Sequence, residues 1–242
     1  MLIETEFHIS LDEKDLIKYQ GKRFERLLNR PGISISFHLM KDKIQQIARP
    51  ILGWDRFKVK GIDHDRFVLD NGVKIGGGKM VEIMKESSEL LVGVCTLGIL
   101  VDQEIDSLQK SKEMMNAVLL DSLANWMVDQ VRSSFIDRFK RDIESEELFY
   151  STSMGPGEVW DISDQRTIFK LLDDVKIKEN LGLELRESML MVPMKSVSFV
   201  MGLAKDPFGM KNVSKCDFCL NKKKCRHPEA MRHENVAVAP DS

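Results

Sequence analysis

A cluster of cysteines near the end of the chain has the composition and spacing of a metal site. Three of the four cysteines lie within ten residues, as Cys216, Cys219 and Cys225. A two-residue gap lets two thiolates bind one ion, and a short loop can bring the third to it. His227, His233 or an outside group can complete a zinc site, whereas three cysteines also suit a [4Fe–4S] cluster with one open iron. The spacing leaves zinc and iron–sulfur open, and a tail of reduced, unliganded cysteines is the alternative to both.

A second candidate site is a loop rich in glycine, serine and proline. Residues 149–160 read Phe-Tyr-Ser-Thr-Ser-Met-Gly-Pro-Gly-Glu-Val-Trp. Glycine lets the backbone approach a ligand closely, and the flanking aromatic side chains can stack on a flat ring. The alternative is a tight turn between a strand and a helix, which these residues alone favour. Asp161 or Ser163 is expected to cap the following helix, which carries Gln165 and Phe169.

Other catalytic signatures are missing from the sequence. Gly76-Gly77-Gly78-Lys79 lacks the spacing of a phosphate loop and is not followed by serine or threonine, so it predicts a turn that opens a helix over 79–85. We find no nucleophile–base pair, no zinc-protease helix and no dinucleotide fingerprint. The fourth cysteine, Cys95, lies in an apolar run and is expected to be a small buried hydrophobe.

Size and charge describe an ordinary globular protein. The 242 residues fit one domain with an appendage, and 36 basic against 38 acidic residues give a net charge of −2. This balance does not indicate nucleic acid as a partner. The first residues lack the basic region and apolar core typical of a signal peptide, and the longest apolar run, 90–101, is too short to span a membrane, so we expect a cytoplasmic protein without a membrane partner.

Apolar spacing predicts the elements that must position these residues. Helices are expected over 12–29, 35–49 and 112–143, the last with a long apolar stripe. Short strand-like runs at 57–59 and 66–69 are expected to form an edge hairpin that turns at Asp70-Asn71-Gly72.

Two further segments indicate the centre of a sheet. Residues 89–96 form a continuous apolar run, which predicts a strand buried on both faces. Residues 187–202 alternate as a strand does, with Pro193 breaking the segment into two at a bulge or kink. Both are expected in one sheet that the 112–143 helix covers.

The segment 185–198 resembles, nearly residue for residue, part of the activation domain of cobalamin-dependent methionine synthase and its stand-alone bacterial relatives. The matching residues are Leu185, Glu187, Ser188, Met191, Pro193, Ser196, Val197 and Ser198. The family's S-adenosylmethionine loop stands about thirty residues earlier in the chain order. There the matching residues are Ser153, Gly155, Trp160, Asp164, Gln165 and Phe169.

The same loop departs from the family pattern at three positions. Ser151 stands at the position of an arginine, Met154 at that of a proline and Pro156 at that of a tyrosine. The arginine is expected to pair with the ligand carboxylate, which serine cannot do. The absence of this arginine predicts about thirtyfold weaker binding of S-adenosylmethionine, and Ser151→Arg should restore the affinity.

The resemblance implies an α+β fold, with a twisted, mainly antiparallel sheet, a long covering helix and a small C-terminal cysteine appendage. It extends over residues 89–203. Residues 1–80 are then an N-terminal helical and hairpin part of one domain with an activation-domain-like core at 81–205. Residues 206–242 are the cysteine-containing tail.

The implied function is reductive activation of a corrinoid (vitamin B12)-dependent methyltransferase or methionine synthase. Inactive cob(II)alamin is reduced and trapped as methylcobalamin by methyl transfer from S-adenosylmethionine. Ser153, Gly155 and Gly157 are expected to hold that ligand, Trp160 to cover it, and Glu187 with Ser188 to add polar contacts.

The chain has no corrinoid-binding Asp-x-His-x-x-Gly motif, so the cobalamin is expected on a partner protein. The electron would come from a flavodoxin or ferredoxin, or from an iron–sulfur cluster in the tail. The alternative is a non-catalytic accessory protein that docks on a corrinoid protein, or an iron–sulfur electron donor to it, without S-adenosylmethionine.

Overall fold

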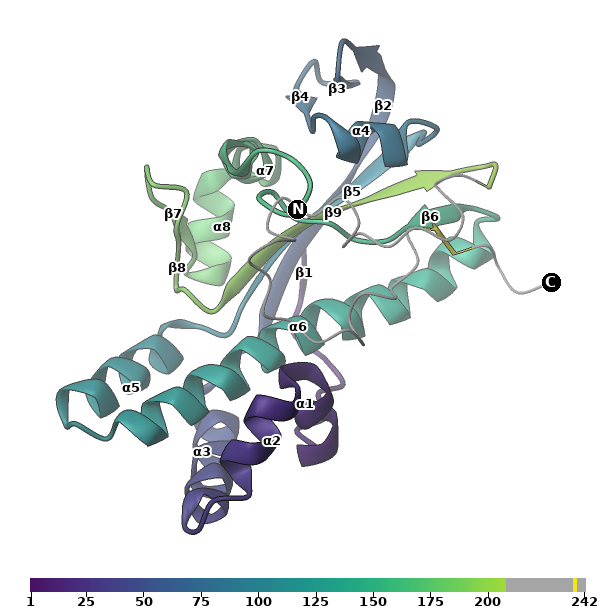
Figure 1. Ribbon diagram of the computed structural model, residues 1–242. Helices are drawn as coiled ribbons and strands as arrows, with labels where there is room; N and C mark the ends of the chain where they lie inside the picture. Colours follow the sequence, from purple (N-terminus) through teal and green to yellow (C-terminus); the bar gives the residue numbers. More distant parts are fainter. Residues whose placement is uncertain (208–236, 239–242) are drawn as a thin grey trace.

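One antiparallel sheet separates two layers of helices (Figure 1). The computed structural model describes residues 1–207 and 237–238. Within these residues the strands follow the order β10-β6-β9-β5-β2-β3-β4, and β1 pairs with β2. The strands of this sheet are β1 (Leu2–Glu4), β2 (Ile51–Asp63), β3 (Arg66–Leu69), β4 (Lys74–Ile75), β5 (Glu89–Thr96), β6 (Phe149–Ser151), β9 (Ser196–Ala204) and β10 (Ala237–Val238).

Eight α-helices lie within the described residues. They are α1 (Glu13–Gln20), α2 (Lys22–Leu28), α3 (Ile33–Ile47), α4 (Lys79–Met84), α5 (Ile99–Lys110), α6 (Met114–Ser145), α7 (Gln165–Leu172) and α8 (Asp174–Leu181). None of these helices is long and apolar enough to cross a membrane.

The central strand is β5, as its apolar run predicts. It pairs with β2 on one side and β9 on the other, and every residue after Glu89 is buried. Because side chains alternate along a strand, Leu91 and Cys95 join the core under α6, whereas Val92 and Val94 join the core on the opposite face. The predicted burial of Cys95 is confirmed, and burial raises the pKa of its thiol to about 12.

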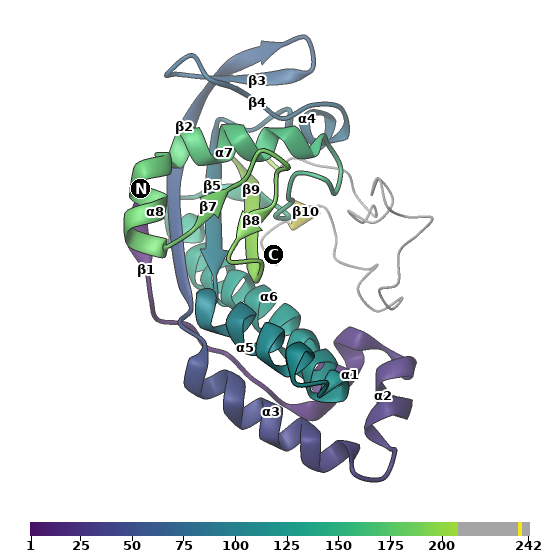
Figure 2. The same ribbon diagram turned by 90° about the vertical axis from the view of Figure 1, so that its left-hand side faces the viewer.

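The long helix α6 covers one face of the sheet, and α3 and α5 pack against α6 (Figure 2). Its predicted apolar stripe is buried, and Phe135 and Phe139 stack there with ring centroids 5.6 Å apart. Phe199 from β9 lies 6.1 Å from Phe135. The Phe199 ring crosses Gly93 on β5, where an added Cβ would lie 2.4 Å from the ring, so only glycine fits beneath it.

The helices α4, α7 and α8 cover the other face (Figure 1). Ile168, Phe169 and Leu172 of α7 are buried against the sheet, and Ile177 and Leu181 do the same for α8. The two cores therefore lie back to back, with the sheet between them.

The predicted single helix over 12–29 is wrong, because Gly21 divides it. Gly21 adopts φ 83° and ψ −179°, a conformation that glycine reaches without a steric penalty, and α2 starts immediately after it. The side chain of Asp12 accepts from the amide of Lys14 at 2.8 Å and so caps α1. The apolar spacing continues through Gly21, so it did not reveal that the segment forms two helices.

The predicted hairpin exists at the sheet edge but joins different strands. The Asn71-Gly72 turn connects β3 to β4, with Gly72 at φ 81°. The turn between β2 and β3 lies instead at His64-Asp65, where His64 has φ 57°. Asn-Gly is the stronger turn signal, so the sequence identified one of two consecutive turns.

The expectation that residues 187–202 share one sheet with β5 is correct only from Ser196 onward. Before Pro193, β8 (Met191–Val192) pairs with β7 (Glu184–Leu185) in a separate two-stranded sheet. Their turn is closed by the Arg186 amide, which donates to the Leu190 carbonyl at 2.9 Å, and Met189 has φ 65°. The two-residue spacing of Met189 and Met191 resembled a strand but belongs to this turn.

Candidate functional site

The predicted ligand loop leaves the sheet at the end of β6 and then lies along β9. Met154 and Val200 exchange two backbone hydrogen bonds, at 2.9 and 2.8 Å. An added Cβ on Gly155 would lie 2.8 Å from the carbonyl oxygen of Ser198, which is closer than Cβ contacts occur. Gly155 is therefore needed for the close approach of the loop to β9, beside the Ser196–Ser198 motif.

The backbone of this loop satisfies much of its own hydrogen bonding. The amide of Gly155 donates to the Glu158 carboxylate at 3.0 Å, and the amide of Glu158 returns to the Gly155 carbonyl at 3.1 Å. The amide of Gly157 donates to the Trp160 carbonyl at 2.9 Å. The loop is consequently a compact, preformed turn.

Two predicted site residues of the loop point into the protein. Ser153 is 9% exposed and Trp160 is 4% exposed, with the indole in the core shared with α7. The Trp160 Nε1 has no hydrogen-bond partner among the described residues, although it is fully buried. A buried indole donor usually has a partner, so the unpartnered Nε1 of Trp160 is unusual.

Ser151 has a structural role that the sequence comparison does not show. Its side chain is 1% exposed, and its Oγ accepts from the Gly202 amide at 2.9 Å and donates to the Thr152 carbonyl at 3.0 Å. These bonds lock β6 onto β9. The Ser151 side chain is therefore buried and engaged in hydrogen bonds within the fold.

Asp164, which matches the family pattern, connects α7 to the β3–β4 hairpin. Its carboxylate is buried and accepts from the Gly76 amide at 2.6 Å, from the Thr167 hydroxyl at 3.1 Å and from the Arg66 guanidinium. Gly76 is 88 residues away in the chain. No local sequence signal predicts this contact, which anchors the start of α7 behind the loop.

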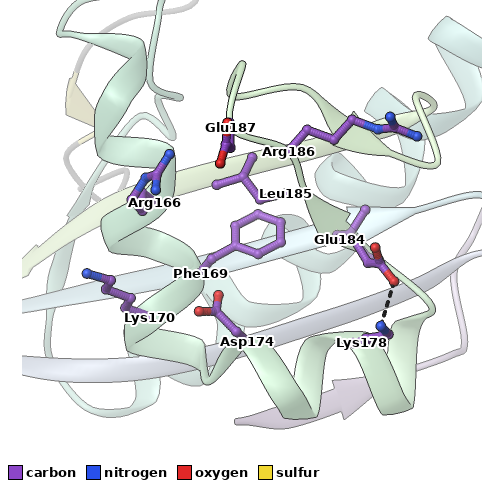
Figure 3. Close-up of a pocket in the computed structure, with 10 residues that line it drawn as sticks. Arg166, Phe169, Lys170, Asp174, Lys178, Glu184, Leu185, Arg186 and Glu187 are labelled. Atoms are coloured by element: carbon purple, nitrogen blue, oxygen red, sulfur yellow. Dashed lines mark ion pairs between the residues drawn. The ribbon is translucent and has the colours of Figure 1, made fainter.

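Glu187 and Ser188 lie in the β7–β8 turn. Glu187 lines a pocket of about 400 Å³ between α7, α8 and β7 (Figure 3). The loop at 153–157 lies against β9 at Ser198 and Val200 instead. The structure thus describes two separate features where the sequence suggested one binding surface.

A buried polar cluster at the start of β9 was missed by sequence reasoning. Lys195 is 8% exposed, and its ammonium contacts Asp121 at 2.5 Å and the Asn125 side-chain oxygen at 2.9 Å, both on α6. Asp102 on α5 is 6% exposed and accepts from the Met194 amide. Burial raises the pKa of Asp102, against the lowering effects of the Met194 amide and the Lys195 charge.

The predicted metal ligands Cys216, Cys219, Cys225 and His227 lie outside the described residues. Within residues 1–207 and 237–238, no group of three or more histidine, cysteine, aspartate or glutamate side chains could hold a metal. The strand β10, which follows these cysteines, pairs with β6 at Ser151 and Tyr150.

Comparison with known proteins identifies a solved structure with a similar fold. No protein-family model and no curated protein sequence matches the chain. Among solved structures, the chain is similar to the crystal structure of the MetH reactivation domain bound to AdoHcy (S-adenosylhomocysteine). The match covers 84% of this chain and 77% of that chain, with a TM-score of 0.54 and 13% sequence identity. The α+β fold predicted from the resemblance is confirmed: this chain has the fold of a reactivation domain.

Proposed function

We propose that this chain reactivates a corrinoid-dependent methyltransferase or methionine synthase, with S-adenosylmethionine as methyl donor. The observation that carries the proposal is the fold shared with a reactivation domain solved with AdoHcy, which is the product left when that donor loses its methyl group. The match of residues 185–198 to the same family supports it, because this segment leads into β9, on which the loop lies.

Ser153, Gly155, Gly157 and Trp160 would hold the ligand. Trp160 fits this role because its Nε1 is a buried donor without a partner among the described residues. Gly155 fits because it sets the close approach of the loop to β9. Glu187 and Ser188 remain predicted contacts from the β7–β8 turn.

The chemistry asks little acid–base catalysis of this chain. S-adenosylmethionine supplies the methyl group to the corrinoid of a separate protein. The chain's residues contribute orientation and a site with little water, for which the rigid loop and the apolar core behind Trp160 are suited.

The electron for this reaction must come from a donor, and we propose a flavodoxin, a ferredoxin or the tail itself. Cys216, Cys219 and Cys225, with His227, would bind zinc or an iron–sulfur cluster, and only the cluster could supply the electron. Elemental analysis of anaerobically purified protein should find stoichiometric zinc or iron that Cys216→Ser removes. Protein without either metal would contradict the metal site.

A transfer assay tests the main proposal. Radiolabelled S-adenosylmethionine, carrying its label in the methyl group, is incubated anaerobically with cob(II)alamin, a chemical reductant and the protein. Label should enter the corrinoid fraction faster with the wild type than with Gly155→Val, whose side chain would meet the Ser198 carbonyl. Gly61→Val is the matched control, because an added Cβ there meets nothing within 4 Å. Equal rates with and without protein would contradict the proposal.

A second candidate is the accessory protein that docks without S-adenosylmethionine. It is favoured by the engaged Ser151 hydroxyl and by the loop amides of Gly155 and Gly157, which already have partners. This alternative predicts that the chain binds a corrinoid protein equally well with and without S-adenosylmethionine. The main proposal predicts that the wild type transfers label from S-adenosylmethionine to the corrinoid, whereas the accessory protein would transfer none. The transfer assay therefore separates the two proposals.

A further inference from the structure

The pocket between α7, α8 and β7 has an apolar floor beneath charged side chains. Its volume is about 400 Å³, and Phe169 and Leu183 are buried at its base. Leu185 is half-buried above the Phe169 ring (Figure 3). An apolar side chain of a small ligand can therefore be removed from water here.

The charges around this floor are only partly paired. Lys178 and Glu184 form an ion pair at 2.9 Å on one side of the pocket. Arg166, Asp174 and Glu187 have no hydrogen-bond or ion-pair partner for their side chains in the described part of the chain.

Two of the unpaired groups are placed for opposite ends of one ligand. Figure 3 shows the Asp174 carboxylate pointing toward the Phe169 ring, with the Arg166 side chain on the other side of that ring. Lys170 and Arg186 also line the pocket, with their charged ends directed away from the Phe169 ring. The floor is thus flanked by one guanidinium and one carboxylate, with Glu187 at the rim.

We propose that this pocket binds a zwitterionic α-amino acid with an apolar side chain. Arg166 would bind the ligand carboxylate through two parallel hydrogen bonds, a geometry that guanidinium groups favour. Asp174 would accept from the ligand ammonium group, and Phe169 would contact the side chain. The inference depends only on the pocket and goes beyond the proposed reactivation.

The charge pattern argues against other small ligands. A phosphate or a dicarboxylate beside the Phe169 ring would bring further negative charge next to Asp174 and Glu187, whereas the charged ends of Lys170 and Arg186 are directed away from the ring. An uncharged apolar ligand would cover Arg166 and Asp174 without satisfying them, which costs free energy. A zwitterion gives both Arg166 and Asp174 a partner of opposite charge.

The test is an NMR titration of ¹⁵N-labelled full-length protein with L-leucine. L-Leucine at about 10 mM, a concentration suited to weak binding, should shift the amide signals of α7, α8 and β7. N-acetyl-L-leucine amide, which has the same side chain and neither charge, should shift them much less. Absence of shifts with L-leucine, or equal shifts with both compounds, would overturn the proposal.

Two variants test which side chains bind the charged groups of the ligand. Arg166→Gln and Asp174→Asn should each weaken L-leucine binding about tenfold, the usual effect of losing a hydrogen bond to a charged group. Arg26→Gln, at an exposed position of α2, is the matched control and should bind as the wild type does. Unchanged binding by Arg166→Gln would also overturn the proposal. Because this readout does not use S-adenosylmethionine, its failure leaves the reactivation proposal standing.

Discussion

The two faces of the sheet are covered by different kinds of helix. On one face, α6 runs for 32 residues and presents a continuous apolar stripe to the sheet. On the other face, α7 and α8 have eight residues each, and Asp164 cross-links the start of α7 to the β3–β4 hairpin. Both faces are held by apolar packing, and on the second face the Asp164 cross-link also fixes the position of α7.

The candidate binding features follow the same division. The loop residue Trp160, with its unpartnered Nε1, and the pocket at Phe169 both belong to the face with the short helices. A short helix buries fewer apolar side chains than α6 does, so it can adjust more readily when a ligand binds. We therefore expect substitutions under α6 to change stability most, and substitutions on the other face to change binding most.

The largest effect on stability is expected from Phe135→Ala, on the buried side of α6. Phe135 is 2% exposed and contacts the rings of Trp54, Phe139 and Phe199. Its truncation should lower the free energy of unfolding by about 4 kcal/mol, measured by urea denaturation. Leu39→Ala, on the exposed side of α3, is the control and should change it by less than about 0.5 kcal/mol. A small effect of Phe135→Ala would remove the contrast between the faces.

The next largest effect is expected from Ser151→Arg. The substitution would bury a guanidinium beneath β9 and leave the Gly202 amide unpaired, which should cost about 3 kcal/mol of unfolding free energy. The sequence comparison alone predicted tighter ligand binding from the same change. Thermal denaturation and ligand titration of one sample decide between the two outcomes: tighter binding with unchanged stability would show that position 151 faces the ligand.

Asp164→Ala tests the cross-link on the other face. It removes the acceptor of the Gly76 amide and of Arg66, and should cost about 2 kcal/mol, because Arg66 can turn to solvent. Hydrogen exchange should speed up at Gly76 and in the first turn of α7, with little change in α6. Thr167→Val, which removes only the hydroxyl donor, should have roughly half the effect. Equal protection in all variants would contradict the cross-link.

The smallest effect is a pH dependence at Asp102. Burial raises the pKa of this carboxyl in the folded protein, where Asp106 adds to the effect and the Met194 amide and Lys195 oppose it. The folded state thus holds the proton more tightly than the unfolded state. Stability from the protonated form is lost as the pH rises through the folded pKa. As the pH rises above about 4, the ordinary pKa of an aspartate, the unfolding free energy of the wild type should fall relative to Asp102→Asn. A constant difference would contradict the raised pKa.

Local patterns predicted the parts of the fold that depend on apolar spacing. The runs of β5 and α6 are long and consistent, so their burial follows from neighbouring residues alone. The breaks were harder to predict. Gly21 interrupts an otherwise regular helix, and Met189 has a positive φ within an apparent strand, which side-chain spacing does not encode.

The candidate site was predicted less completely because its contacts are distant in the chain. The loop at 153–157 could be located from its residue types, but its packing on Ser198 and Val200 depends on strand pairing. The roles of Ser151 and Asp164 depend on Gly202 and Gly76, at separations of 51 and 88 residues. The pocket joins three elements whose arrangement no local pattern specifies.

Calorimetric titration of the full-length protein with S-adenosylhomocysteine tests the central claim most directly. We expect a saturable heat signal in the wild type. Trp160→Phe should weaken binding about tenfold, because the phenyl ring lacks the Nε1 donor. The smaller ring also leaves a cavity in the core, so the free energy of unfolding should fall by about 1–2 kcal/mol, and binding is compared at a temperature where both proteins are folded. Absence of heat up to millimolar ligand, or equal affinity of wild type and Trp160→Phe, would contradict a ligand site at this loop.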